Sequence, residues 1–418
     1  MNAAASDARP RGVAMITSRY HPLFGGAAVQ ARRLSASLAA RGWLPLVITA
    51  RSGDAPLRDS VDGLPVLRTP TFGARSYRWF TLLFWLGSAI ALLLRPRAWS
   101  ILHIHGVSHF SWFPLAVARI LRRPAIVKMT LMGADDADAV TGGLRGWLQR
   151  QVFLGADAVI SISTPMSDAY RATDLDAEKL VEMPQGVDVE RYRPASPEER
   201  RALRERLGLA PEGALLVCVG AIFHRKGSDI VVEAFERLAA ERPDLRLVMV
   251  GMDDTTWDPV ELSDETRFCL DLKARLAEGG LADRVRFTGV VDNVEDYMRA
   301  ADLFVFPSRK EGFGTVMVEA MAVGLPCLVS PIDGIAATVF QTAEQGVIVP
   351  EEDPGRWASE IAALLDDPAR AARMGAAARA AAERRYSFER VADIYEALYR
   401  ALLAGRPVSG VAQARLEA

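Results

Sequence analysis

The chain has 418 residues and a mass of 45.5 kDa; 50% of its residues are hydrophobic and 24% are charged. This balance excludes a disordered, collagen-like or coiled-coil protein, and the length predicts two or three domains. Three cysteines without metal-ligand spacing, Cys218, Cys269 and Cys327, exclude a disulfide framework and favour a reducing compartment. The first twelve residues lack the apolar core of a signal peptide, so we do not expect a secreted protein.

The net charge of −2 hides an asymmetry along the chain. Residues 1–186 hold 21 Lys and Arg against 13 Asp and Glu, whereas the remainder holds 29 against 39. Residues 63–134 contain nine basic residues and no acidic one. This imbalance predicts attraction to an anionic partner such as a membrane surface or a phosphorylated acceptor. We expect no nucleic acid as partner, because the sequence has neither zinc-finger spacing nor an RNA-reading aromatic motif.

Short apolar runs rich in β-branched residues alternate with longer segments of helical periodicity. The first series of predicted strands covers 13–17, 44–49, 101–104, 125–129 and 158–163, and the second covers 215–219, 245–250, 285–287, 303–306 and 327–330. Helical periodicity is clearest in 26–41, 228–240 and 315–323. This alternation predicts an α/β architecture of parallel sheets that helices cover on both faces.

The two series of strands predict two doubly wound domains. Residues 184–186 and the polar stretch 194–206 separate the series and are predicted to form an interdomain linker. The domains are therefore 1–186 and 187–387. Residues 388–418 begin with a helix to about residue 403, with Ser387 as N-cap, which we expect to pack on the first domain before a frayed tail. Two such domains facing each other predict a site at the carboxyl ends of their strands.

The most specific motif is PSRKEGFGTVMVEA at residues 307–320, which follows a predicted strand and continues into a predicted helix. Gly312 and Gly314 let the backbone approach a ligand closely, and the helix start offers unpaired N–H groups to an anion. Glu311 precedes the helix and Glu319 lies inside it, so the two carboxylates can meet different parts of one elongated ligand. The alternative is a tight turn with a surface glutamate and a helical one.

A second strand-to-helix motif is VGAIFHRKGS at residues 219–228. Adjacent Arg225 and Lys226 before a helix N-terminus form a compact pair of cations for a phosphate group. A solvated basic loop is the alternative. The third motif, YHPLFGGA at residues 20–27, places Gly25 and Gly26 after the first strand, where twin glycines serve either close ligand approach or plain packing.

In this order the three motifs resemble those of retaining glycosyltransferases with the GT-B fold, specifically glycosyltransferase family 4. Residues 184–188, PQGVD, match the family's interdomain Pro-Asn-Gly-Val-Asp, with Gln185 in place of asparagine. The resemblance runs from about residue 13 to about residue 402. It implies two facing Rossmann-like domains with an interdomain cleft, the second of which binds a nucleotide sugar.

The resemblance also implies roles for individual residues. Arg225 and Lys226 hold the nucleotide diphosphate, Glu319 binds the ribose hydroxyls, and Glu311 binds the hydroxyls of the donor sugar beside the anomeric carbon. Gly25 and Gly26 border the diphosphate from the first domain. The remaining members of the binding set are the opening glycine of the second-domain loop and the backbone that leads into the helix: Gly220, Gly312, Phe313, Gly314, Thr315 and Val316.

Two departures from the family pattern limit this transfer of roles. The family usually has arginine directly after the glycine of the second-domain loop, where this chain has Ala221, so one cation is missing and Arg225 is the candidate replacement. The family also usually has His-Gly after the strand that matches 125–129. Here Met132 occupies the histidine position, so that histidine's role is not carried over.

Three histidines, His103, His105 and His109, cluster around one strand end in a chain with only five. We expect His105 or His109 on the acceptor side, with His105 as the candidate catalytic residue; packed or surface histidines are the alternative. A zinc site is not expected, because no carboxylate or cysteine joins them. The acidic clusters at 135–138 and 253–254 are interpreted as solvated loops, with Asp135 possible in the acceptor cleft. No metal is expected, because the basic loop neutralises the diphosphate.

Residues 79–94, WFTLLFWLGSAIALLL, carry no charge and lie between Arg78 and Arg95. As a helix they measure about 24 Å, short of the ~30 Å hydrocarbon core of a bilayer. A helix that is apolar nearly all round is either buried or in contact with lipid. Two tryptophans in the segment and the flanking arginines favour lipid. We therefore expect a cytoplasmic protein that docks peripherally on the inner face of the plasma membrane through the predicted helix 78–95.

Together the motifs predict a metal-independent retaining hexosyltransferase. The donor is a nucleotide-diphosphate sugar, with a UDP-sugar favoured. The acceptor is a hydroxyl of a glycan, glycolipid or other lipid-linked molecule in cell-surface polysaccharide or glycolipid synthesis. Two alternatives stay open: a nucleotide-sugar epimerase of the same fold, and a non-catalytic nucleotide-sugar-binding subunit.

Overall fold

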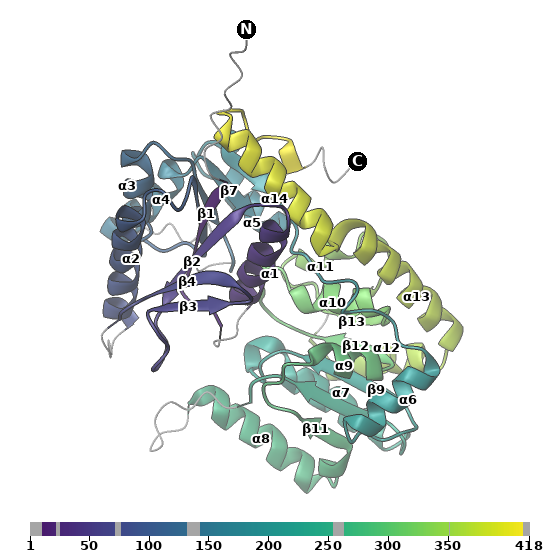
Figure 1. Cartoon of the computed structure of the whole chain (residues 1–418). Coiled ribbons are helices and arrows are strands. Elements are labelled where there is room, and N and C mark those ends of the chain that lie inside the picture. Colours follow the sequence, from purple (N-terminus) through teal and green to yellow (C-terminus); the bar gives the residue numbers. More distant parts are fainter. Residues whose placement is uncertain are drawn as a thin grey trace. The chain divides into compact units, whose positions relative to one another are not determined.

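The computed structural model describes residues 11–21, 26–71, 77–131, 143–253, 263–350 and 352–412. The chain divides into two compact units, unit 1 (residues 1–186 and 388–418) and unit 2 (residues 187–387). Each unit is a largely parallel sheet with helices packed against it (Figure 1). The α/β class predicted from strand–helix alternation is confirmed.

Unit 1 is built on an eight-stranded sheet with the order β3-β4-β2-β1-β5-β6-β7-β8. All neighbouring strands are parallel except β3 and β4. The central strands are buried along their whole length, as expected for continuous apolar runs covered on both faces. The strands are β1 (Gly12–Thr17), β2 (Leu44–Ala50), β3 (Arg58–Val61), β4 (Leu64–Thr69), β5 (Ile101–His105), β6 (Ala125–Lys128), β7 (Ala158–Ser161) and β8 (Leu180–Glu182).

The β3–β4 hairpin was not predicted, although its turn is visible in the sequence. Asp62 and Gly63 join the strands with φ angles of 53° and 76°, both in the left-handed region. An Asp-Gly pair between strands is the sequence signature of a type I′ turn, whose twist matches that of the flanking strands. The hairpin extends the edge of the sheet next to β2.

Helices of unit 1 connect the parallel strands, and α2, α3 and α4 lie side by side (Figure 1). The predicted helix at 26–41 is present as α1. The helices are α1 (Gly26–Ala40), α2 (Tyr77–Leu94), α3 (Trp112–Ile120), α4 (Gly143–Gly155), α5 (Thr164–Arg171) and α14 (Phe388–Leu403).

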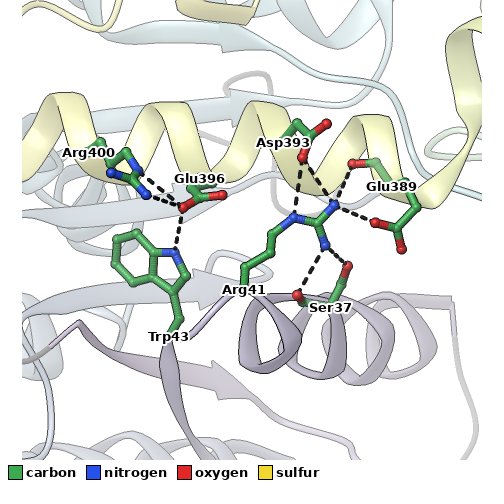
Figure 2. Close-up of polar contacts among 7 residues, drawn as sticks. All are labelled: Ser37, Arg41, Trp43, Glu389, Asp393, Glu396 and Arg400. Atoms are coloured by element: carbon green, nitrogen blue, oxygen red, sulfur yellow. Dashed lines mark hydrogen bonds and ion pairs between the residues drawn. The ribbon is translucent and has the colours of Figure 1, made fainter.

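The last helix, α14, is fastened to unit 1 by polar contacts (Figure 2). Arg41, just beyond α1, donates to the carboxylates of Glu389 at 2.5 Å and Asp393 at 3.1 Å. The indole of Trp43 donates to Glu396 Oε1 at 3.3 Å. Several pairs on one helix face hold α14 along its length, so the chain returns to unit 1 after completing unit 2.

Unit 2 is built on a six-stranded sheet that is parallel throughout, with the order β11-β10-β9-β12-β13-β14. The strand order reverses between β9 and β12, because successive strands are added to one side up to β11 and to the other side from β12. Ligands of open α/β sheets bind at such a switch point, beyond the carboxyl ends of the strands. The strands are β9 (Leu215–Val219), β10 (Arg246–Val250), β11 (Val285–Phe287), β12 (Leu303–Phe306), β13 (Cys327–Val329) and β14 (Val347–Ile348).

The prediction of a linker over 194–206 is wrong for most of that stretch. Residues Pro197–Arg206 form helix α6, which packs on α9 within unit 2. Ser196 and Glu199 make a capping box: the Ser196 hydroxyl accepts from the Glu199 N–H at 3.2 Å, and the Glu199 carboxylate accepts from the Ser196 N–H at 3.0 Å. Arg204 then pairs with Asp302 at 2.7 Å. The polar composition reflects an amphipathic surface helix.

The helices of unit 2 lie between its strands and after its last strand. The predicted helices at 228–240 and 315–323 correspond to α7 and α10. The helices are α6 (Pro197–Arg206), α7 (Ser228–Ala239), α8 (Asp264–Glu278), α9 (Val294–Ala300), α10 (Thr315–Val323), α11 (Ile335–Val339), α12 (Pro354–Leu365) and α13 (Pro368–Ala381).

Helix α2, predicted at 78–95, is neither wholly buried nor wholly exposed. Phe84 and Trp85 are core residues, at 0% and 3% exposure. The face of the helix that points away from this core is exposed. It carries Trp79, which is 63% exposed, and also Leu86, Ile90, Leu93 and Leu94. The two alternatives left by the sequence therefore each describe one face of the same helix. Within the described part of the chain, no helix has the length and hydropathy needed to cross a bilayer.

This division of α2 predicts opposite effects on stability for two aromatic residues. Phe84→Ala should lower the free energy of unfolding by about 3–5 kcal/mol, because it empties a site in the core. Trp79→Ala should change it by less than about 0.5 kcal/mol, since the side chain is largely in solvent. Urea unfolding followed by far-UV circular dichroism measures both values. Equal losses would contradict the orientation of the helix.

Candidate functional site

The two most specific sequence motifs meet at the switch point of the second sheet. The loop after β9 carries Lys226 and the loop after β12 carries Glu311, and these two strands are direct parallel neighbours. The Lys226 ammonium donates to Glu311 Oε1, and the Ser308 hydroxyl donates to the same oxygen, at 2.8 Å. Both charged side chains are largely buried, at 17% and 11% exposure. A cation and a carboxylate are therefore fixed side by side before any ligand binds.

Backbone contacts hold the two loops together. Arg225 donates from Nη1 to the carbonyl of Lys310 at 2.6 Å, and the Arg309 N–H donates to the carbonyl of Arg225 at 2.9 Å. Gly227 has a φ of 69°, and a Cβ on it would lie 2.1 Å from the carbonyl oxygen of Pro307. Only glycine permits this approach, which explains the Lys-Gly sequence of the loop.

Helix α10 begins directly beyond Glu311 and brings the rest of the predicted set to the same place. Gly314 caps the helix with a φ of 73°, and Thr315 and Val316 form its half-buried first turn. The N–H groups of such a turn point outward along the helix axis and attract an anion. Glu319 follows one turn later and is 7% exposed. The site thus offers an anion-binding helix end between two carboxylates.

Other members of the predicted set support this arrangement. Phe313 is 3% exposed, and its ring packs edge-on against Tyr386 with 6.1 Å between centroids. Gly220 lies along the aliphatic stem of Lys226: a Cβ on it would be 3.7 Å from Lys226 Cδ. Gly312 lies between Glu311 and Phe313 and is buried with them. Every predicted residue of unit 2 therefore lies in or beside the two loops and α10.

Arg309 was not predicted as part of this site. Its guanidinium pairs with Asp229 at 2.8 Å and with Glu352 at 2.9 Å. Ser308 belongs to the same motif but was not predicted as a site residue, and its hydroxyl donates to the Glu311 carboxylate. A hydroxyl three residues before a functional carboxylate is the one signal in the sequence that points to this contact.

Some predicted residues lie outside the described residues, namely Gly25, Met132, the acidic cluster 135–138 and Asp254. Gly26 begins α1 directly after that gap. Asp253 is partly buried and pairs with Lys273 at 2.8 Å, so its carboxylate is not simply solvated. Among the residues that the structure describes, no three histidine, cysteine, aspartate or glutamate side chains gather in a way that would hold a metal ion.

The predicted clustering of histidines at one strand end is present: His105 is the last residue of β5, a central strand, and it is 4% exposed. Its role toward an acceptor stays a prediction. Its ring stacks on that of His103 at 4.1 Å. Burial, and for His103 the neighbouring His105, hold the pKa of both imidazoles well below the usual value, with Lys128 contributing. His109 is half-buried, and burial and Arg145 lower its pKa.

A buried polar cluster in unit 1 was not predicted. Lys128 on β6 donates to Gln185 Oε1 at 3.1 Å and to the Tyr395 hydroxyl at 2.9 Å. His103 Nδ1 lies 2.7 Å from the Tyr399 hydroxyl. Burial lowers the pKa of Lys128 to about 7. Through this cluster, Gln185 near the end of the first segment of unit 1 and helix α14 both bind to strand β6. The sequence contained one indication of this cluster, because Lys128 lies inside a segment that is predicted to be a buried strand.

Comparison with known proteins identifies the family. The model described as "Glycosyl transferases group 1" matches residues 199–381, and the "Glycosyl transferase 4-like domain" matches residues 25–186. D-inositol 3-phosphate glycosyltransferase of Xylanimonas cellulosilytica is 30% identical over 415 residues, which cover 92% of this chain and 96% of that protein. The chain is a group 1 glycosyltransferase.

A second relative of this glycosyltransferase is a GDP-mannose-dependent monoacylated alpha-(1-6)-phosphatidylinositol monomannoside mannosyltransferase from Corynebacterium glutamicum. It is 34% identical over 216 residues, which cover 50% of this chain and 52% of the relative. The solved structure of HepE from Anabaena, in complex with UDP and glucose, superposes with a TM-score of 0.73 at 18% identity and covers 92% of this chain and 98% of HepE. The predicted GT-B fold is confirmed.

The depressed pKa of Lys128 predicts a pH dependence of stability. An unfolded lysine stays protonated up to about pH 10, whereas the native one releases its proton above about 7, so the unfolded state binds more protons in between. Wild type should therefore gain stability over Lys128→Met by up to about 1.4 kcal/mol per pH unit from pH 7 to pH 9. Below pH 7 the difference should be constant.

Urea unfolding at pH 6, 7, 8 and 9, followed by tryptophan fluorescence, measures this difference. Comparing two proteins cancels the titration of the buried tyrosines and cysteines. Lys310→Met, which changes an exposed lysine, serves as the control and should show no pH-dependent difference. A constant difference between wild type and Lys128→Met from pH 6 to pH 9 would show that Lys128 titrates as an ordinary lysine.

Proposed function

We propose that this glycosyltransferase transfers a hexose from a nucleotide-diphosphate sugar, a UDP-sugar in the first instance, to a hydroxyl of a glycan or glycolipid. The proposal includes retention of the anomeric configuration and independence of metal ions. The observation that carries it is the meeting of Lys226, Glu311 and the first turn of α10 at the switch point of the second sheet. Cations and helix N–H groups suit a diphosphate, and carboxylates suit sugar hydroxyls.

The chemistry needs stabilisation of a leaving diphosphate. As the bond from the anomeric carbon to the phosphate oxygen breaks, negative charge grows on that oxygen and the sugar becomes oxocarbenium-like. Lys226, with Arg225 beside it, and the N-terminus of α10 would face this charge, and preorganised groups of this kind supply much of the rate of an enzyme. The acceptor hydroxyl would attack from the side that the leaving group occupied and give its proton to the departing phosphate, so no metal or covalent intermediate is needed.

Donor and acceptor classes are proposed from the relatives. HepE was solved with UDP, and also with UDP-glucose, which supports a UDP-sugar. The Corynebacterium relative is named for GDP-mannose and a monoacylated phosphatidylinositol mannoside, which supports a glycolipid acceptor while giving a different nucleobase. A panel of UDP- and GDP-sugars tested for nucleotide release, with and without lipid extract as acceptor, is therefore the first experiment.

That panel also separates the alternatives. An epimerase would convert the donor sugar without an acceptor and release no nucleotide diphosphate. A non-catalytic binding subunit would bind the donor and change nothing. A transferase releases the nucleotide in step with formation of a glycosylated product, and at most hydrolyses the donor slowly when alone.

We predict that Lys226→Ala lowers the rate of transfer by about 10²–10³, as expected when one preorganised charge-stabilising donor is removed. Arg225→Ala should cost nearly as much if it replaces the cation missing at Ala221. Lys310→Ala removes the same charge from an exposed neighbour of Glu311 and is the matched control, expected within twofold of wild type. A normal rate for Arg225→Ala would leave Lys226 as the sole cation of the loop. A normal rate for Lys226→Ala would contradict the proposal.

The two carboxylates should differ in the ligand that they recognise. Glu319→Ala should weaken binding of UDP alone, because it removes the proposed contact with the ribose. Glu311→Ala should leave UDP binding nearly unchanged but weaken binding and turnover of the UDP-sugar. Isothermal titration with UDP and with UDP-glucose measures both. Equal losses of UDP affinity would refute this assignment of roles.

We also propose that unit 1 docks on an anionic membrane surface. Twelve of the fifteen large apolar side chains that are exposed among the described residues belong to this unit. They include Trp79 and Leu94 of α2, Trp112 of α3 and Trp147 of α4, three helices that pack side by side. Residues 63–134, which include α2 and α3, contain nine basic residues and no acidic one, and Asp135, Asp136 and Asp138 follow before α4. Exposed tryptophans beside arginines suit the interface of an anionic bilayer.

Flotation with liposomes tests this docking. Wild type should float with vesicles that contain phosphatidylglycerol and float less at high salt, because the attraction is partly electrostatic. Trp79→Ser/Leu94→Ser should lower flotation at least fivefold. Leu270→Ser/Val290→Ser, which removes exposed apolar side chains of unit 2, is the control and should float as wild type. A wild type that stays soluble with every vesicle would refute the docking.

A further inference from the structure

An open apolar groove lies between helix α2 and the β3–β4 hairpin of unit 1. Its volume is about 420 Å³. Leu83, Leu86, Ile90 and Leu94 form its helix side, and Leu57 and Leu67 face them from the hairpin region. None of the described residues that line it is acidic. A groove of this composition offers an aliphatic molecule more contact than a flat apolar surface would.

The packing of α2 explains why the groove exists. Gly87 has no side chain, so the helix approaches β4 closely: a Cβ on Gly87 would lie 3.0 Å from Cβ of Thr69. Larger residues before and after it, Leu86 and Ile90, stay 40% and 48% exposed. The helix therefore packs on β4 and β2, closely at Gly87, while Leu86 and Ile90 stand along the open groove. Burying these side chains requires an additional molecule.

The groove has the length of one lipid chain in a leaflet. Its lining on α2 runs from Leu83 to Leu94, twelve residues, or about 18 Å at the helical rise. One leaflet contributes about 15 Å of hydrocarbon, half of the ~30 Å core. The length of the groove therefore matches a single extended acyl chain better than it matches a globular ligand.

Two arginines give the groove a polar rim. Arg58 and Arg95 both line it and both reach solvent. Neither has an ion-pair partner among the residues that the structure describes. Arg68, which also lines the groove, is satisfied differently, because it pairs with Asp59 at 2.8 Å. Two unpaired guanidinium groups beside an apolar channel suit a molecule with an aliphatic chain and an anionic head.

We propose that this groove binds one acyl chain of an anionic membrane phospholipid, with Arg58 and Arg95 at its phosphate. The inference rests on the docking of unit 1 on a membrane and adds a defined lipid site to it. A lipid drawn partly out of the bilayer into the groove would fix the orientation of the unit on the surface. The other occupants to be tested against it are a second copy of the chain and a lipid-linked acceptor.

Binding of monomeric single-chain lipids tests the site without a membrane. The probe is myristoyl lysophosphatidylglycerol below its critical micelle concentration, titrated into the full chain by isothermal calorimetry. We expect saturable binding of one molecule. Shortening the chain should weaken binding about threefold to fourfold per CH₂, and glycerol 3-phosphate alone should not bind. Absence of saturable binding to wild type would overturn the proposal.

Two neighbouring residues of α2 provide a matched pair of variants. Ile90 lines the groove and is 48% exposed, whereas Leu93 is 49% exposed and does not line it. Ile90→Gln should weaken lysolipid binding at least tenfold, and Leu93→Gln should leave it within twofold. Both changes are at exposed positions, so both variants should fold. Equal effects of the two would show general adsorption on the helix and overturn the proposal.

The arginines and the alternative occupants complete the test. Arg58→Ala/Arg95→Ala should weaken binding of the anionic lysolipid about tenfold and leave binding of uncharged monomyristoylglycerol unchanged; Arg97→Ala is the control. A wild-type dimer in light scattering that Ile90→Gln converts to monomer would make the groove an interface between copies and overturn the proposal. Glycosylation of the bound lysolipid when a donor is added would make it an acceptor site instead. Transfer activity without lysolipid binding would refute only the lipid site. Lysolipid binding without nucleotide release would refute only the proposed transferase chemistry.

Discussion

The contact between Lys226 and Glu311 depends on one topological constraint, the reversal of strand order between β9 and β12. The helices that follow β9 and β12 lead toward opposite sides of the sheet. The loops at the carboxyl ends of these two strands therefore have space to contact each other beyond the sheet. Close approach of Gly227 to Pro307 brings them within contact, and the Ser308 hydroxyl orients the carboxylate. Helix α10 then starts where the second loop ends, so its N-terminus points into the same space. The charge arrangement of the site follows from the sheet.

The first sheet has the same construction and a different chemistry. Its order reverses between β1 and β5, so the start of α1 at Gly26 and the end of β5 at His105 follow neighbouring strands of the sheet. Here the structure places a buried hydrogen-bonded cluster of imidazole, ammonium and tyrosine hydroxyl groups rather than an ion pair. His103 and Lys128 face tyrosines of α14, a helix that joins the unit after the whole of unit 2. Unit 1 therefore takes part of its core from α14, a segment that follows unit 2 in the chain.

Much of the fold and most of the donor-side site could be predicted from the sequence, because the signals are local. Strand runs, the Lys-Gly loop and the Glu-Gly-Phe-Gly motif each lie within fifteen residues and each has one physical purpose. The prediction of a linker over 194–206 rests on polarity and overlooks a local signal, the capping box of Ser196 and Glu199. Other differences between prediction and structure come from tertiary context. His103 packs against Tyr395 and Tyr399 of α14, almost 300 residues away in the chain, and the two faces of α2 are distinguished only by what packs against each of them. The Asp62-Gly63 turn was a local signal that was overlooked.

We propose that the loops after β9 and β12 together with α10 form one ligand site. Hydrogen–deuterium exchange of the full chain with and without saturating UDP-glucose tests this site most directly, because it reports backbone protection without any substitution. We expect protection of peptides that cover residues 220–228 and 308–319, with the early turns of α10 among the most protected. UDP alone should protect α10 and leave the loop with Glu311 less protected. Protection confined to other parts of unit 2, with both loops unchanged, would show that the ligand binds elsewhere.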